Sequence, residues 1–408
     1  MNNKIELLSP CGDYERFVLA LQYGADAVYL GGNAFTMRAA PKNFSQEELA
    51  KAVALAHSVG KKVYLTCNVY AHSASLSLLP DFLAKARDAG VDAFIIADLG
   101  VLKLAKDIAP DVDIHISTQA GITNYQSAMV YRDLGAKRIV PARELSLEEI
   151  AELRAKTDAS LEIECFVHGA MCMSVSGRCL LSSFMVGRDA NLGMCAQPCR
   201  WQFHMTDITR EGIEYPVVED QYGTYFMNSR DMCMIEHIPA LIRAGIDSFK
   251  IEGRAKSAYY TAVVTNAYRQ AIDGYYAAPS ADYVPQPWIL EEMDKVSHRE
   301  YSTGFYFQHP DKDGNTDYRG GYINEWDVVA FVADSDGEVL TLSQRNKFNP
   351  GEVLEVLEPQ KPPLTITPEA LFNEALQPIE SANHAMMTVK IKSPLRFAQN
   401  SIVRKKST

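Results

Sequence analysis

The chain has 408 residues, which is long enough for one large domain and a smaller one. Its hydrophobic content of 47% and charged content of 22% are typical of a globular protein. It shows neither a membrane-spanning run nor a signal peptide, so we expect a cytoplasmic protein with no membrane partner. The net charge of −11 argues against an extended basic coat that grips nucleic acid, although it leaves room for a local basic patch.

A repeated pattern runs through the first 275 residues. An amphipathic helical segment ends at a glycine, and a short strand rich in β-branched residues follows. The segment from Ser146 to Lys156 shows the helical part clearly, because Ser146 and Glu149 have the spacing of a capping box. Eight strands are predicted in chain order, over residues 5–9, 27–30, 62–66, 93–97, 114–118, 138–141, 161–166 and 248–251.

This alternation of strands and helices predicts the fold class. Strands that are apolar along their length and separated by helices indicate a parallel sheet covered on both faces. Eight such strands favour a closed barrel over an open doubly wound sheet, which is the main alternative. We therefore predict an α/β protein in which residues 1–275 form a (β/α)8 TIM-like barrel.

The connection after the seventh predicted strand is much longer than the others and holds most of the cysteines. Because such long connections are usually functional, we interpret residues 169–235 as a cysteine-rich insertion above the mouth of the barrel. Residues 276–319 combine a proline-rich stretch with a short helical pattern, which predicts a helical linker. From residue 320 short strands alternate with turns, which predicts a small C-terminal β-barrel domain over residues 320–408.

Polar side chains follow several of the predicted strands, where TIM barrels carry their reactive groups. A single such residue is as readily structural as functional, but a ring around one mouth favours a site. The cationic side chains at these strand ends could bind a carboxylate or a phosphate. Alternatively, they could form ion pairs with the neighbouring carboxylates of Glu144 and Glu252. The candidate catalytic residues are Glu164, His168, Arg143 and Glu252, and the candidate substrate-binding residues are Lys250, Arg254, Asn68 and Gln119.

The cysteines form the most specific pattern. In an intracellular chain, clustered cysteines indicate metal binding or catalysis rather than disulfides. Four thiolates are what a [4Fe–4S] cluster requires, and the lack of Cys-x-x-Cys pairs disfavours structural zinc. Zinc, incidental burial and a nucleophilic pair of Cys172 with His168 stay open as alternatives. The clustered residues are Cys172, Cys179, Cys195, Cys199 and Cys233, whereas Cys11, Cys67 and Cys165 are expected to pack in the core.

The segment from Glu164 to Ser182, which contains Cys-Phe-Val-His-Gly-Ala-Met-Cys, resembles the signature of the collagenase-like peptidase family U32. Segments that begin at Leu7, Gly24 and Phe249 also resemble this family, so the likeness covers essentially the whole chain. Among its members the chain is most similar to the tRNA uridine hydroxylases. The segments that carry this second likeness begin at Arg143, Cys195, Asn228 and Gln344.

The resemblance implies an oxygen-independent hydroxylation that forms 5-hydroxyuridine at the wobble position of tRNA, with prephenate as hydroxyl donor or co-substrate. It implies tRNA and prephenate as partners, and a paralogous protein is a further expected partner. Other members imply the alternatives, which are a collagenase-like peptidase and a hydroxylase of rRNA or of a ubiquinone precursor. The resemblance also implies a [4Fe–4S] cluster held by Cys172, Cys179, Cys195 and Cys233, with Cys199 as a spare thiol.

The role of such a cluster stays open. A cluster with an exchangeable iron position could act as a Lewis acid, but four cysteine ligands leave no position open. Ligand exchange would restore that role, and a structural or electron-transfer cluster would not need it.

Overall fold

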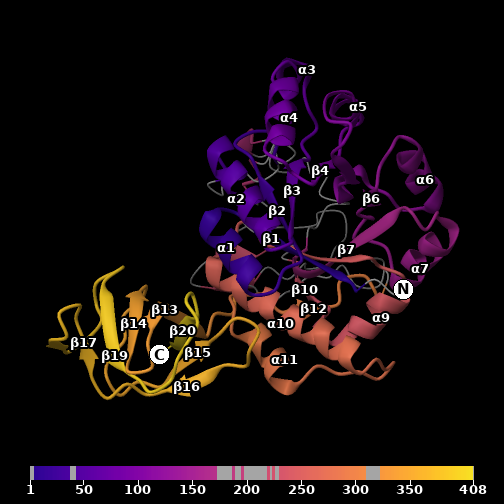
Figure 1. Ribbon diagram of the computed structural model, residues 1–408. Coiled ribbons are helices and arrows are strands. Elements are labelled where there is room, and N and C mark those ends of the chain that lie inside the picture. Colours follow the sequence, from indigo (N-terminus) through magenta and orange to yellow (C-terminus); the bar gives the residue numbers. More distant parts are fainter. Residues whose placement is uncertain are drawn as a thin grey trace.

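The computed structural model describes residues 4–36, 43–171, 186–188, 194–196, 218–220, 223–225, 229–308 and 322–407. Eight parallel strands form a closed ring in these residues, because β7 pairs with β11 and so joins the two ends of the strand order. The predicted TIM-like barrel is therefore confirmed, and Figure 1 shows its strands inside a ring of helices. The barrel strands are β1 (Glu6–Cys11), β2 (Ala27–Gly31), β3 (Lys62–Cys67), β4 (Ala93–Ile96), β5 (Asp113–Ile116), β6 (Arg138–Ile139), β7 (Glu162–Ala170) and β11 (Ser248–Ile251).

Helix α7 and the glycine that follows helix α1 lie where the sequence pattern predicts them. Helix α7 starts with the expected capping box, in which the Ser146 hydroxyl accepts from the Glu149 N–H and the Glu149 carboxylate accepts from the Ser146 N–H. Gly24, which follows helix α1, has a φ of 105° and ends that helix in the left-handed region. The barrel helices are α1 (Tyr14–Gln22), α2 (Gln46–Ser58), α3 (Ser73–Leu76), α4 (Leu79–Asp88), α5 (Leu99–Ile108), α6 (Tyr125–Asp133), α7 (Leu147–Lys156), α9 (Ile238–Arg243) and α10 (Ala258–Ala277), with short turns η1 (Thr118–Ala120) and η5 (Ile235–His237).

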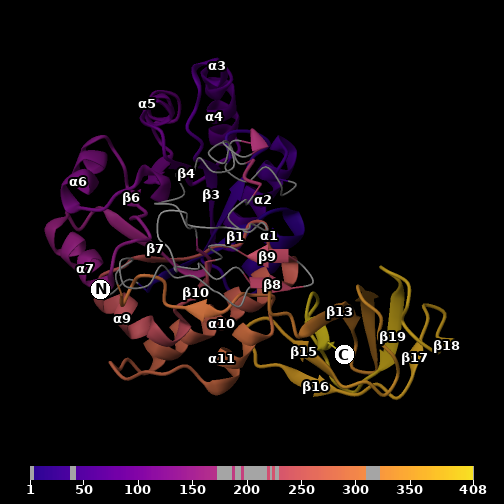
Figure 2. The ribbon, with the colours of Figure 1, turned by 180° about the vertical axis from the view of Figure 1, so that it is seen from behind.

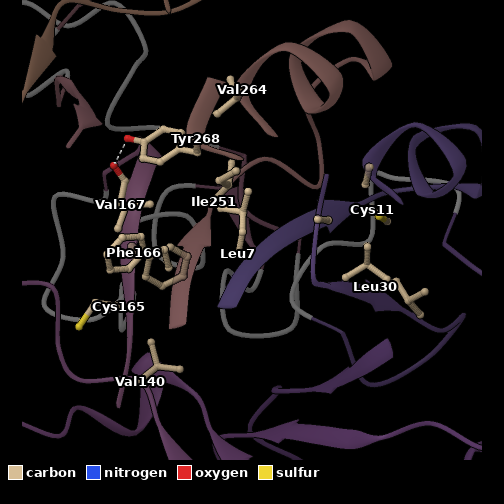
Figure 3. Packing of buried hydrophobic residues seen from close by; sticks show 14 of the residues in the cluster. Leu7, Cys11, Leu30, Val140, Cys165, Phe166, Val167, Ile251, Val264 and Tyr268 are labelled. Atoms are coloured by element: carbon tan, nitrogen blue, oxygen red, sulfur yellow. Dashed lines mark hydrogen bonds between the residues drawn. The ribbon is translucent and has the colours of Figure 1, made fainter. Parts of the chain in front are cut away.

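The main hydrophobic core lies between the barrel strands and the helices. Alternate side chains of each strand point to opposite sides, so Leu7 packs in this outer core while Leu8 belongs to a small apolar cluster inside the barrel. Helix α10 closes part of the outer core: its Tyr268 hydroxyl donates to the Val167 carbonyl oxygen at 2.7 Å. Figure 3 shows this contact beside Leu7 and Ile251. The core therefore holds the strand ends of the barrel in place.

Two short strands extend the sheet beyond the barrel. Strand β10 (Asp231–Cys233) runs antiparallel to the end of β7, and β12 (Tyr301–Ser302) runs parallel to β10. The hairpin β8 (Val218–Asp220) and β9 (Gly223–Tyr225) precedes them, and helix α11 (Pro287–Asp294) leads into β12. No described helix combines the length and the apolar character that crossing a membrane requires.

A separate C-terminal domain follows, as predicted. It is an eight-stranded antiparallel sheet with a hydrophobic core of its own. Figure 2 shows it beside helices α10 and α11 of the barrel domain. The hydroxyl of Tyr23, the residue after helix α1, joins the two domains by donating to the carbonyl oxygens of Leu357 and Asn400. Its strands are β13 (Trp326–Ser335), β14 (Val339–Gln344), β15 (Leu354–Leu357), β16 (Leu364–Ile366), β17 (Leu371–Phe372), β18 (Pro378–Ile379), β19 (Thr388–Lys392) and β20 (Ile402–Lys406).

Candidate active site at the barrel mouth

A buried ionic network fills the barrel interior at the N-terminal ends of the strands. Arg138, the first residue of β6, forms ion pairs with Glu6 and Glu162 at 2.6 Å and with Glu164 at 3.0 Å. The Tyr64 hydroxyl donates to Glu6 at 2.6 Å. Burial alone would raise the pKa of Glu6, but the neighbouring Arg138 cation holds that pKa below its ordinary value. This network closes the floor of the site.

Arg138 is not among the site residues predicted from the sequence. The sequence feature that could have identified it is a cation at the start of an apolar strand. Glu162 and Glu164 follow it along the chain, on one side of the next strand. A charge that cannot reach solvent needs a buried partner. The identity of that partner depends on how the strands close into a ring.

Lys250 connects the network to the upper part of the barrel. Its ammonium lies 2.6 Å from the Glu164 carboxylate and 4.5 Å and 5.4 Å from the ring centres of Tyr29 and Phe166. The side chains of Glu164 and Lys250 are 0% and 5% exposed. The structure thus brings together a candidate catalytic residue and a candidate substrate-binding residue as a buried ion pair below the mouth.

Arg143 forms the clearest cationic group at the mouth. It follows β6, and its guanidinium carbon lies 3.9 Å from the centre of the Phe166 ring. Nη1 donates to the Ala170 carbonyl oxygen at 2.9 Å, and Nη2 lies 3.7 Å from Glu252. The candidate catalytic residues Arg143 and Glu252 are therefore neighbours. A guanidinium held against an aromatic ring in this way is suited to binding a carboxylate or a phosphate.

Arg254 lies across the end of β2. It is buried, and Nη1 lies 3.4 Å from the hydroxyl of Thr66 on β3. A Cβ atom on Gly31 would overlap this nitrogen, which explains why a residue without a side chain ends β2. The absence of a side chain at Gly31 thus provides the space for the guanidinium of Arg254.

Asn68 and Gln119 form a pair of amides on the same rim. The Asn68 amide donates to the Gln119 side-chain oxygen at 2.8 Å, and the Tyr70 hydroxyl donates to the Gln119 carbonyl oxygen. The two residues follow β3 and β5, so the parallel barrel brings them to one edge. Paired amides can present both a donor and an acceptor to a polar substrate.

His168 lies apart from the other candidates. A bulge shifts the pairing of β11 with β7 at this position, and the imidazole contacts the rings of Tyr260, Tyr268 and Tyr301, with centroids 5.4–5.9 Å away. The Tyr268 hydroxyl is 3.4 Å from Nδ1. Burial, with Lys256 as a further cause, lowers the pKa of His168 to about 3, so the ring is neutral near pH 7.

Cys11, Cys67 and Cys165 lie within the core cluster of the barrel. Burial raises the pKa of the Cys67 and Cys165 thiols, as expected for cysteines that pack rather than react. Cys195 is exposed in the described segment 194–196. The predicted ligands Cys172 and Cys179, together with the spare Cys199, lie outside the described residues.

Cys233 ends strand β10, opposite His168. Burial raises the pKa of its thiol to about 12. An ion pair between Arg299 and Asp231 at 2.6 Å anchors β10, and Ser229 donates to the carbonyl oxygen of Met171, the residue before Cys172. Within the part of the chain that the structure describes, no three Cys, His, Asp or Glu side chains are arranged to hold a metal ion.

Comparison with known proteins places these residues in a family. Peptidase family U32 matches residues 12–316, and the peptidase family U32 C-terminal domain matches residues 324–404. The tRNA hydroxylation protein P1 of Bacillus subtilis is 37% identical over 99% of this chain and 96% of that protein. The tRNA hydroxylation protein P of Escherichia coli is 33% identical over 95% of this chain and 91% of that protein.

A further relative is named for a different RNA. The 23S rRNA 5-hydroxycytidine synthase of Escherichia coli is 34% identical over 84% of this chain, which corresponds to 50% of that protein. Both domains of the chain and its full length are thus matched. The family expected from the cysteine signature is confirmed: the chain belongs to peptidase family U32.

Proposed function

We propose that this chain is a cytoplasmic tRNA-modifying enzyme that hydroxylates the wobble uridine to 5-hydroxyuridine without molecular oxygen. The observation that carries the proposal is the similarity, over nearly the full length of both chains, to proteins named for tRNA hydroxylation. The mouth of the barrel adds chemical support, since its side chains are suited to a polar, anionic substrate. The proposal includes prephenate as hydroxyl donor or co-substrate and a [4Fe–4S] cluster.

Arg143 is the residue that would bind a carboxylate of the donor. Its guanidinium lies against the Phe166 ring and is fixed by the Ala170 carbonyl oxygen, so little rotamer freedom would be lost on binding. A donor with two carboxylates needs a second cation, and Arg254 lies at the ends of β2 and β3, on the same mouth of the barrel. Glu252 beside Arg143 would then orient the guanidinium, and Asn68 with Gln119 would face the polar edge of a base.

The cysteines fit a cluster by their chemistry and distribution. Three of the eight are in the core, which leaves the five of the cysteine-rich stretch as thiolate donors. Cys172, Cys179, Cys195 and Cys233 would hold the cluster, which would supply electron transfer or structural stability when bound. A bound metal lowers the pKa of a thiol, which would offset the effect of burial on Cys233.

Nucleoside mass spectrometry tests the reaction. tRNA from a strain without this gene is expected to lack 5-hydroxyuridine and its derivatives, and a plasmid copy of the chain should restore them. A Cys179→Ala copy is expected to fail. If the nucleosides are unchanged in a strain that also lacks any paralogous gene, the proposed reaction is wrong.

Iron and sulfide analysis of anaerobically purified protein tests the cluster. We expect about four irons and four sulfides per chain and a broad absorption band in the visible range, both lost in Cys233→Ala. Cys67→Ala is the matched control, because it removes a buried thiol from the barrel wall and should retain the iron. Zinc without iron in the wild-type protein would exclude the proposed cluster.

The second candidate function is hydroxylation of rRNA, which the relative named for 23S rRNA favours. The same mass spectrometry on rRNA distinguishes the two. Loss of a hydroxylated pyrimidine from rRNA, with unchanged tRNA, would assign the chain to this alternative.

A further inference from the structure

The outer face of the C-terminal sheet carries an unusual set of side chains. On β14 and β19 the inward residues Leu340, Leu342, Val389 and Ile391 are buried in the domain core. The residues between them point outward, because side chains alternate along a strand. The register places them in three rows: Ser343 beside Thr388, Thr341 beside Lys390, and Val339 beside Lys392.

Two lysines, Lys390 and Lys392, are the cations of these three rows. Lys390 donates to the carbonyl oxygen of Glu374 at 3.1 Å, and the Lys392 ammonium lies 5.8 Å from the centre of the Phe372 ring. In the described parts of the chain, neither ammonium has a carboxylate oxygen within ion-pair distance. On a chain with a net charge of −11, two such cations in one strand form a local positive patch.

Asp334 places a carboxylate on the same face. It lies opposite Thr341 in the pairing of β13 with β14, and one of its oxygens accepts from the Ser335 N–H. The carboxylate is therefore engaged locally. Its negative charge makes the face less uniformly basic, and a uniformly basic face would attract any polyanion.

A third cation lies where the face meets the barrel. Arg345 follows β14, and its guanidinium lies 5.0 Å from the Phe331 ring centre and 3.0 Å from the Ser343 hydroxyl. Unlike the two lysines, it has a carboxylate partner, since it forms an ion pair with Glu15 of helix α1 at 3.2 Å. These residues line a groove of about 350 Å³ between α1 and the sheet. Ser343 belongs to both, so the groove and the face are continuous.

The chemistry of this surface fits an RNA backbone. Lysine and arginine contact phosphates, and serine and threonine hydroxyls donate to phosphate or sugar oxygens. An aromatic ring such as Phe372 gives a base a stacking surface. The five residues from Val339 to Ser343 span roughly 13 Å of strand, enough for a short stretch of backbone.

We propose that the outer face of β14 and β19, with Arg345 at its end, is a docking surface for the sugar–phosphate backbone of the tRNA substrate. The inference rests on the proposed function and deepens it, because it assigns binding of the RNA body to the C-terminal domain. The barrel mouth would then handle only the reacting nucleotide. This division resolves how an acidic chain holds a polyanion.

Salt-dependent tRNA binding by the full-length chain tests the surface. In Lys390→Ala/Lys392→Ala we expect at least a tenfold loss of affinity for labelled tRNA at physiological salt. The slope of log affinity against log salt should fall by about 1.4, which is the loss of two phosphate contacts to a single strand. Phe372→Ala should lower affinity with an unchanged salt slope, since stacking releases no counterions.

The control is Lys85→Ala/Lys103→Ala, which removes the same charge from exposed residues of helices α4 and α5. Its affinity and salt slope should match the wild type. Equal losses in both double variants would show an effect of net charge alone and overturn the docking surface. Unchanged binding in the Lys390 and Lys392 variant would also overturn it, as would displacement of tRNA by polyglutamate at equal charge.

The two proposals fail in distinguishable ways. The reaction alone would be refuted if the wild-type protein binds tRNA through this face but the hydroxylated nucleosides of tRNA do not depend on the gene. The docking surface alone would be refuted if the hydroxylated nucleosides depend on the gene but Lys390→Ala/Lys392→Ala binds tRNA as well as the wild type does.

Discussion

The guanidinium of Arg404 in β20 and the carboxylate of Glu292 in helix α11 form an ion pair at the junction of the two domains, with Nη1 and Oε2 separated by 2.7 Å. Both side chains are 0% exposed. Burial alone would lower the pKa of Arg404, but Tyr259 and the carboxylate of Glu292 raise it above its ordinary value. A buried cation of the C-terminal domain thus pairs with a buried carboxylate of helix α11, and this ion pair attaches the domain to the barrel.

Arg404→Met is expected to weaken this attachment. Removing the cation leaves the buried Glu292 carboxylate with the Lys295 ammonium, 3.1 Å away, in place of two cations, which costs up to about 3–5 kcal/mol of unfolding free energy. Urea unfolding and limited proteolysis should show a destabilised chain that is cut near the junction. Lys405→Met is the control, because its ion pair with Glu352 is more exposed and contributes less than about 1 kcal/mol. Equal effects in the two variants would contradict the prediction.

Arg138→Met is expected to destabilise the barrel by a similar amount. The substitution leaves three carboxylates, those of Glu6, Glu162 and Glu164, close together without their shared cation. Unfolding free energy measured in urea should fall by about 3–5 kcal/mol. Arg132→Met, on the exposed side of helix α6, should change it by less than about 0.5 kcal/mol. A fall below 1 kcal/mol in Arg138→Met would mean that the network relaxes or admits water.

His115 should make the barrel sensitive to acid. Its ring is buried 4.6 Å from that of Tyr64, and burial, followed by Arg138 and Lys250, lowers its pKa well below the ordinary value. The unfolded chain, with a His pKa of about 6.5, therefore binds the proton more readily than the folded chain. Stability due to neutral His115 is present above about pH 6.5 and is lost as the pH falls below it.

The test is the pH dependence of urea unfolding in His115→Gln. Between about pH 6.5 and 5 the slope of unfolding free energy against pH should decrease by up to one proton relative to wild type. The same slope in both proteins would show that His115 does not take up a proton on unfolding in this range.

Gly169→Ala is expected to damage the site more than the fold. Gly169 has a φ of 106°, and a Cβ atom there would overlap the carbonyl oxygen of Glu252. The substitution therefore moves the loop after β11 that carries Glu252 next to Arg143. Gly60→Ala is the control, since its φ of 70° imposes a comparable backbone cost of about 1–2 kcal/mol with open space around the new methyl group.

Complementation of a strain without the gene, followed by nucleoside mass spectrometry, compares the two alanine variants. Gly60→Ala should restore hydroxylated tRNA, and Gly169→Ala should restore at most about a tenth of it. Equal restoration would show that the position of Glu252 is not critical.

Arg143→Lys should retain charge but lose activity. A lysine ammonium cannot stack flat on Phe166 or donate in two fixed directions, so the cation would no longer be held in place. We expect at least a tenfold loss of tRNA hydroxylation with an unfolding free energy within about 1 kcal/mol of wild type. Arg132→Lys on helix α6 is the control, because it makes the same arginine-to-lysine replacement away from the mouth. Full activity in Arg143→Lys would exclude a role for guanidinium geometry.

The sequence by itself was sufficient to predict the eight barrel strands, the capping box of α7 and the separate C-terminal sheet. These features depend on local patterns: the alternation of apolar strands with helices and the Ser146–Glu149 spacing. It was also sufficient to identify the family, because the cysteine signature is contiguous in the chain. The placement of Arg143, Asn68 and Gln119 at one rim follows from the rule that parallel strands end at the same edge.

Only the tertiary structure decided which of these side chains meet. Arg138 pairs with Glu6, 132 positions away, and Arg404 pairs with Glu292 at a separation of 112, because ring closure and domain docking determine such pairs. His168 faces three tyrosines rather than the mouth because a bulge shifts the register of β7. Local sequence encodes the direction in which each side chain leaves its strand, but the neighbours on that side come from the closure of the whole barrel.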